Sequence, residues 1–134
     1  MRVIVDTSVW SLAFRRRKAV KTPEVDALVH LVQQGQVVLL GPVRQEVLSG
    51  IKHRDQFERL REHLAAFPDL ELTIKDFETA AELCNLCITE GVQAAHTDFL
   101  IAAAAVTRGY AVLSADRDFD NIARIIPVRK YELR

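Results

Sequence analysis

The chain has 134 residues, of which 49% are hydrophobic and 27% are charged, a composition that suits one folded domain and excludes a disordered chain. Its 18 basic residues balance 18 acidic ones, so the formal net charge is zero and a domain-wide positive field for nucleic acid is excluded. No apolar stretch reaches membrane-spanning length and no signal peptide precedes the first strand, which predicts a cytoplasmic protein that does not contact a membrane.

The amino terminus predicts a buried strand followed by a helix. Residues 2–6 are apolar between charged ends, so the predicted strand closes with Asp6. Thr7 or Ser8 is expected to cap the helix that continues to about Phe14. The basic run that comes next predicts either a solvated loop or a contact with nucleic-acid phosphates, and it comprises Arg15, Arg16, Arg17 and Lys18.

The middle of the chain continues the alternation of helical and extended patterns. Thr22 with Pro23 and Glu24 marks a helix start, because a threonine cap precedes a proline in the first turn. Glu46 lies in the first turns of the next predicted helix. The predicted elements are a helix over 22–35, a strand over 37–40, a helix over 43–50, a helix over 55–67 and a strand over 70–74.

The second half carries two more acids at favourable places. Thr97 is expected to cap a helix with Asp98 in its first turn, where a carboxylate suits the positive end of the helix dipole. Asp116 follows the next apolar strand. The predicted elements are a helix over 77–89, a helix over 96–108, a strand over 111–114, a helix over 119–124 and a strand over 125–128.

Strands that alternate with helices along the whole length predict one fold class. The pattern indicates βαβ units with right-handed crossovers and a central, mainly parallel sheet. We therefore expect residues 1–134 to form a single three-layer α/β domain in which helices flank the sheet on both faces.

Four acidic residues, Asp6, Glu46, Asp98 and Asp116, each follow a predicted strand or lie near a helix start. Because the carboxyl ends of strands in an open α/β sheet gather at one edge, we expect these side chains to meet there. Clustered carboxylates repel one another unless a cation holds them, and Mg²⁺ prefers oxygen ligands while keeping positions for a substrate. The pattern predicts a site for one or two hard cations, suited to phosphodiester cleavage.

Other chemically active residues have simpler interpretations. Cys84 and Cys87 are three positions apart on one apolar helix face, which favours core packing over redox or metal chemistry. Trp10 is expected in the core or at a dimer interface, although its ring would suit base stacking. His96 is interpreted as a loop residue and not as a general base. Zinc is disfavoured because the four histidines show no paired ligand spacing.

The acidic motifs, taken together, resemble those of a PIN domain. They occur in the order and at the separations found in that family, and the resemblance covers essentially the whole chain. The short length and the opening sequence are most similar to the VapC-type toxins of prokaryotic toxin–antitoxin pairs. The segments that carry the resemblance are Asp6-Thr7-Ser8, Glu46, Asp98-Phe99-Leu100-Ile101-Ala102-Ala103 and Ser114-Ala115-Asp116-Arg117-Asp118-Phe119.

This resemblance implies a Mg²⁺- or Mn²⁺-dependent ribonuclease that acts on RNA, forms a homodimer and is inhibited by a cognate VapB-type antitoxin. The acidic quartet would supply catalytic metal ligands, Asp118 would be an additional ligand, and Thr7 or Ser8 would orient a metal-bound water. Ser114 stands where the family often has threonine, which preserves the hydroxyl. The residues implied as ligands are Asp6, Glu46, Asp98, Asp116 and Asp118.

Two alternatives remain open at this point. One is a PIN-like RNA-binding module without catalysis, although binding alone gains nothing from clustered negative charge. The other is a phosphotransfer enzyme with Asp6 as a covalent nucleophile, although Ser8 stands where one such class needs a second aspartate.

Overall fold

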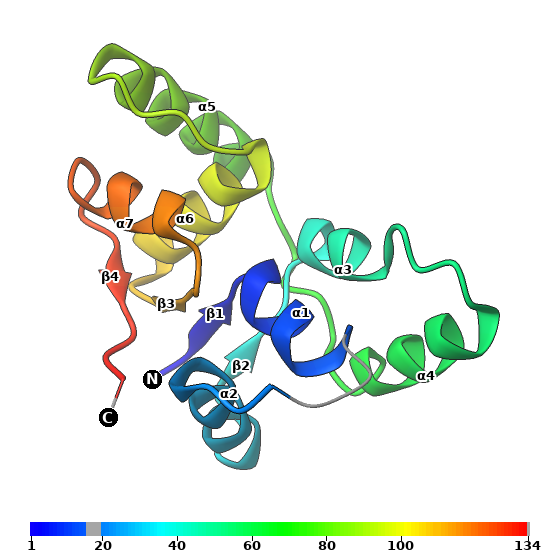
Figure 1. Ribbon diagram of the computed structural model, residues 1–134. Helices are drawn as coiled ribbons and strands as arrows, with labels where there is room; N and C mark the ends of the chain where they lie inside the picture. Colours follow the sequence, from blue (N-terminus) through cyan, green and yellow to red (C-terminus); the bar gives the residue numbers. More distant parts are fainter. Residues whose placement is uncertain (16–19, 134) are drawn as a thin grey trace.

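A four-stranded parallel sheet forms the centre of the molecule, in the order β2-β1-β3-β4. The computed structural model describes residues 1–15 and 20–133, so the part of the basic run after Arg15 lies outside the described residues. Figure 1 shows the sheet between the helices. Its strands are β1 (Val3–Val5), β2 (Val37–Val38), β3 (Ala111–Leu113) and β4 (Arg129–Lys130).

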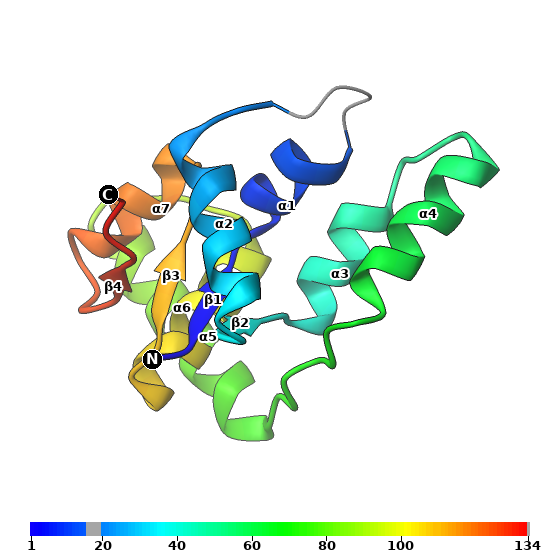
Figure 2. The ribbon, with the colours of Figure 1, turned by 90° about the horizontal axis from the view of Figure 1, so that it is seen from below.

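Helices cover both faces of this sheet. They are α1 (Thr7–Phe14), α2 (Pro23–Gln33), α3 (Gly41–Leu48), α4 (Arg54–Leu64), α5 (Ile74–Thr89), α6 (His96–Arg108) and α7 (Arg117–Ala123). Figure 2 shows α1 and α2 on one side of the sheet and α5 and α6 on the other, which confirms the predicted three-layer α/β architecture. The pair α3 and α4 lies beyond the β2 edge. Within the described residues, no helix combines the length and apolar composition that crossing a membrane requires.

The core lies between the sheet and its two helical layers. All three residues of β1 and of β3 are buried, as expected for parallel strands covered on both faces. Trp10 is fully buried and its indole N–H donates to the carbonyl of Val5 at 3.2 Å, so the core interpretation is confirmed and base stacking by this ring is wrong. The small residues Ala102–Ala105 are also buried and let α6 approach its neighbours closely.

Two predicted helix caps are wrong because a carboxylate takes the place of the expected hydroxyl. Asp6, not Thr7 or Ser8, caps α1 and accepts the backbone N–H of Thr7 at 2.7 Å. At α6 the cap position is Ala95, and Asp98 accepts its N–H at 3.2 Å, so Thr97 is not the cap. The predicted start of α2 is confirmed, since the Thr22 hydroxyl accepts the N–H of Val25.

Two predicted strands are also wrong. In the segment 70–74 the alternating pattern gives way to a helix start, because Thr73 and Asp76 form a capping box that opens α5 at Ile74. The only pairing nearby in the described residues is an isolated bridge between Leu39 and Asp69. The apolar segment 125–128 fills the core from a turn, and the last strand is β4, just beyond it.

The two cysteines pack as predicted. Cys87 is fully buried and Cys84 is half-buried against the core, and both are free thiols. Burial, together with the neighbouring Cys84, raises the pKa of the Cys87 thiol, which makes that thiol less reactive.

Candidate functional site

The four acids of the predicted site come from four different elements. Asp6 directly follows β1, Asp116 follows β3 and caps α7, Asp98 lies in the first turn of α6, and Glu46 belongs to α3. In Figure 1 the carboxyl ends of β1 and β3 lie near the beginnings of α6 and α7. The structure therefore places these acids at the edge of the sheet where α/β proteins bind ligands.

Electrostatics shows that these carboxylates are close enough to affect one another. Asp98 is only 8% exposed, and burial raises its pKa to about 7, with further increases from the charges of Asp6, Asp116 and Glu46. The hydrogen bond from the N–H of Ala95 acts in the opposite direction. The structure thus places Asp98 within electrostatic range of Asp6, Asp116 and Glu46, while the role of the four acids as one site stays a prediction.

Asp6 is the most firmly held of the four. It is 3% exposed, and three donors fix its two oxygens. The N–H of Thr7 reaches Oδ1, while the hydroxyls of Ser8 and Ser114 donate to Oδ2 at 2.9 and 2.8 Å. These contacts fix the rotamer of a buried carboxyl group, and none of the three donors carries a positive charge.

The two serines also join the site to the turn after β3. The hydroxyl of Ser8 accepts the N–H of Ala115, and the hydroxyl of Ser114 accepts the N–H of Asp116, each at 3.0 Å. Each hydroxyl therefore accepts from the β3–α7 turn and donates to Asp6. The sequence pattern named both serines but did not reveal this network, because its partners are distant in the chain.

Glu46 is oriented by one contact from a residue distant in the chain, and Asp116 accepts one from a near neighbour. The Thr7 hydroxyl donates to Oε1 of Glu46 at 3.1 Å, so Thr7 positions an acid instead of capping its own helix. Asp116 accepts the N–H of Asp118 at 2.9 Å. The carboxylate of Asp118 is exposed and is not among the charges that raise the pKa of Asp98, and His96 is exposed at the start of α6.

The donor set has the chemistry of a hard-cation site. None of the ion pairs in the described part of the chain involves the four acids, so their mutual repulsion is uncompensated there. A divalent cation would relieve the repulsion that raises the pKa of Asp98. Over residues 1–15 and 20–133, no three His, Cys, Asp or Glu side chains stand close enough together to hold a metal ion as they are.

Fold and site together define a parallel α/β domain with an acidic site at the carboxyl edge of its sheet. Residues 3–125 match the PIN domain family, and the chain therefore belongs to that family. This match confirms the resemblance inferred from the acidic motifs.

Known relatives match almost the entire chain. It is 28% identical over 134 residues to the ribonuclease VapC11 of Mycobacterium tuberculosis, covering 98% of this chain and 99% of that protein. Among solved structures, VapBC2 from Rickettsia felis, bound to a DNA fragment from its promoter, has a TM-score of 0.77 at 17% identity over 100% of both chains. FitAcB from Neisseria gonorrhoeae has a TM-score of 0.74 at 20% identity over 97% of this chain and 96% of that one. These structures share the fold.

Proposed function

We propose that this protein is a metal-dependent endoribonuclease that acts as the toxin of a type II toxin–antitoxin pair. The observation that carries the proposal is the convergence of Asp6, Glu46, Asp116 and the buried Asp98 in a PIN domain. The relatives named as VapC ribonucleases, which match along the full length, support RNA as the substrate.

The roles of the side chains follow from the site. Asp6, Glu46, Asp98 and Asp116 would hold Mg²⁺ or Mn²⁺, with Asp118 as an additional candidate ligand. The bound ion would activate water and neutralise charge on the phosphodiester. The chain itself contributes orientation: Ser8 and Ser114 hold Asp6 in place and Thr7 holds Glu46.

The geometry disfavours Asp6 as a covalent nucleophile. Ser8 stands where one class of phosphotransfer enzymes needs a second aspartate. The charges of Asp6, Asp116 and Glu46 all act on Asp98, and such a group of carboxylates is better suited to hold a cation.

We also propose a VapB-type antitoxin as the protein partner. The support comes from the solved structures of similar fold, which include VapBC2 and a VapBC-1 of nontypeable Haemophilus influenzae. Expression of this chain alone should arrest growth, and co-expression of its antitoxin should relieve the arrest. Arrest that persists with Asp98→Asn would show that the toxicity is not catalytic.

The proposed homodimer would use the outer face of α5. Three large apolar side chains near one side of this helix are exposed to solvent, a pattern typical of an interaction face. They are Ile74, Phe77 and Ile88, with exposed fractions of 80%, 52% and 56%.

RNA cleavage by the purified protein tests the proposed activity. Wild-type protein should cleave RNA in Mg²⁺ or Mn²⁺, and EDTA should stop the reaction. Asp98→Asn should abolish cleavage with an unchanged circular dichroism spectrum. Asp26→Asn is the matched control, because it removes an exposed acid from α2 and should leave cleavage intact. Full activity in EDTA would refute metal dependence, and full activity of Asp98→Asn would remove that residue from the site.

A further inference from the structure

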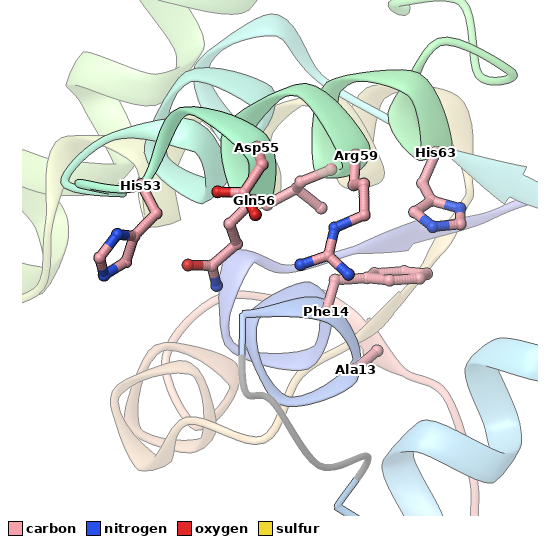
Figure 3. Close-up of a pocket in the computed structure, with 8 residues that line it drawn as sticks. Ala13, Phe14, His53, Asp55, Gln56, Arg59 and His63 are labelled. Carbon is pink, nitrogen blue, oxygen red and sulfur yellow. The ribbon is translucent and has the colours of Figure 1, made fainter.

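A pocket of about 270 Å³ lies between α1 and α4, outside the acidic site. Figure 3 shows that Ala13 and Phe14 of α1 form its floor, while Gln56 and Arg59 point toward them from α4. The pocket is lined largely by polar and aromatic groups. Apolar residues of the neighbouring helix α3, such as Val47, are buried in the core and do not reach it.

One wall of the pocket is a preformed aromatic stack. The rings of Phe14 and His63 lie 5.3 Å apart at an interplanar angle of 25°. Phe14 also stacks on the fully buried Trp10 at 5.9 Å, so the core holds this wall in place. A flat ring held in this way is suited to stack a nucleobase, because every base presents a π-face.

The remaining lining supplies charge and hydrogen-bonding groups. On α4, Arg54 and Arg61 both pair with Glu58, whereas Arg59 pairs with no acid in the described ranges 1–15 and 20–133. The amide nitrogen of Gln56 donates to the carbonyl of Arg15 at 2.9 Å, which fixes that side chain and leaves its amide oxygen as an acceptor. A guanidinium and an amide oxygen beside a ring match the contacts by which proteins bind unpaired bases.

Helix α1 connects the pocket to the acidic site. Asp6 caps the beginning of this helix and Phe14 is its last residue, so the two are about 12 Å apart along the axis. The guanidinium of Arg15 lies next to Gly50 in the α3–α4 loop, because a Cβ at Gly50 would meet it at 3.5 Å. Arg15 therefore adds a positive charge at the end of α1 that carries Phe14.

We propose that this pocket binds one nucleobase of single-stranded RNA about 12 Å along α1 from the acidic site, a short distance along the strand from the scissile phosphate. The base stacks on the exposed ring of His63, which Phe14 supports, and Arg59 contacts the base or its phosphate. A net charge of zero makes such local recognition necessary. The helix of a protein partner would instead require apolar lining for its anchors. The inference rests on the proposed ribonuclease function, since it names a substrate subsite for that reaction.

Binding of uncleaved RNA tests the subsite separately from catalysis. The probe is a fluorescein-labelled single-stranded RNA about 12 nucleotides long, within the span of known single-strand sites, and binding is followed by anisotropy in EDTA. His63→Ala should weaken binding by about five- to 150-fold, the range for loss of one stacking contact, and Arg59→Ala should also weaken binding; both residues are at exposed positions. Arg61→Ala is the charge-matched control on the same helix and should bind as wild type does.

The outcomes separate the subsite from the activity. If Arg59→Ala and His63→Ala bind the probe as tightly as wild type, the pocket is not a base site and the proposal is overturned. If Arg61→Ala weakens binding as much as Arg59→Ala, only general charge is involved and the proposal is overturned. A third outcome is that wild type binds the probe through the pocket but fails to cleave RNA in Mg²⁺ or Mn²⁺. That result would refute the ribonuclease activity, while the pocket would still be an RNA-binding site.

Discussion

The hydroxyl of Ser114 donates to Oδ2 of Asp6 at 2.8 Å, joining residues that are 108 positions apart. Ser114→Ala should leave a buried carboxylate short of one donor and cost about 1.5–3 kcal/mol of unfolding free energy, the value of a hydrogen bond to a charged group. Ser114→Thr keeps the hydroxyl and should cost much less. Urea denaturation in EDTA measures both variants.

A double-mutant cycle tests whether the two serines act together. Ser8 and Ser114 donate to the same oxygen of Asp6, so the losses from Ser8→Ala and Ser114→Ala should not add. If the two losses of unfolding free energy add, each hydroxyl stabilises the fold only by accepting a hydrogen bond from its backbone N–H, and not by donating to Asp6.

Asp98 should make the metal-free protein less stable as the pH rises from about 4 to about 7. Burial, with the charges of Asp6, Asp116 and Glu46, raises its folded-state pKa from 3.8 to about 7. A carboxyl group with a raised folded-state pKa contributes stability below its unfolded-state pKa, and this stability is lost as the pH rises through the folded-state value. Asp98→Asn should therefore unfold at higher urea than wild type at about pH 8, and show little gain at about pH 5.

The same pair of proteins reports on cation binding. Saturating Mn²⁺ should stabilise wild type, by about 2.7 kcal/mol at 100 times the dissociation constant, and should stabilise Asp98→Asn less. Loss of the carboxylate at the start of α6 offsets the relief by about 0.3–1 kcal/mol. Asp6→Asn is a poorer test, because it also disturbs the hydrogen bonds from Ser8 and Ser114. Equal shifts with Mn²⁺ in wild type and Asp98→Asn would place the cation elsewhere.

The ion pair between Arg108 and Asp76 should resist acid. Its two hydrogen bonds are 2.7 and 2.8 Å long, and the guanidinium is the main cause that lowers the pKa of Asp76 from 3.8 to about 2. A lowered folded-state pKa gives stability that is present above about pH 4 and lost as the pH falls toward 2. Arg108→Ala should cost about 1.5–3 kcal/mol at neutral pH, and less near pH 2, where Asp76 is protonated.

Two further variants serve as controls for the ion pair between Arg108 and Asp76. Arg108→Lys keeps the charge but loses the bidentate geometry, so its loss of unfolding free energy should lie between those of wild type and Arg108→Ala. Arg54→Ala breaks a pair whose arginine side chain is 85% exposed and should cost no more than about 1 kcal/mol. Equal losses from Arg54→Ala and Arg108→Ala would show that burial of Asp76 does not strengthen the pair.

Phe77→Ser should weaken self-association if α5 forms the dimer face. Val29→Ser is the control, since Val29 on α2 is 51% exposed and Phe77 is 52% exposed. Sedimentation velocity over a range of concentrations should show dimers for wild type and Val29→Ser, and mainly monomers for Phe77→Ser. Unchanged dimers of Phe77→Ser would exclude that side chain from the interface.

The sequence predicted those features that depend on local pattern and general topology. The apolar runs before Asp6 and Asp116 predicted buried strands, and the parallel arrangement then required their carboxyl ends to meet. The Thr22 cap was predictable because its partner Val25 is three residues away. The four acids could be proposed for the same reason: each lies in or next to an element that the pattern already defines.

Features that depend on distant partners were not predictable in this way. Thr7 looks like a cap in the sequence, but its hydroxyl donates to Glu46, 39 positions away. The residues of segment 125–128 look like a strand because burial requires apolar side chains whether or not the backbone pairs. The pocket depends on Phe14 and His63 lying side by side, which only the packing of α1 against α4 brings about.

The strand order has a consequence for the chain as it is synthesised. β1 is made first, but β3, its neighbour on one side, begins at Ala111, so one edge of β1 stays unpaired until most of the chain exists. Until then Asp6 lacks Ser114, and Asp116 has not been made. On the ribosome the acidic site would therefore be among the last parts to form. A nascent chain that ends before β3 would lack a complete acidic site.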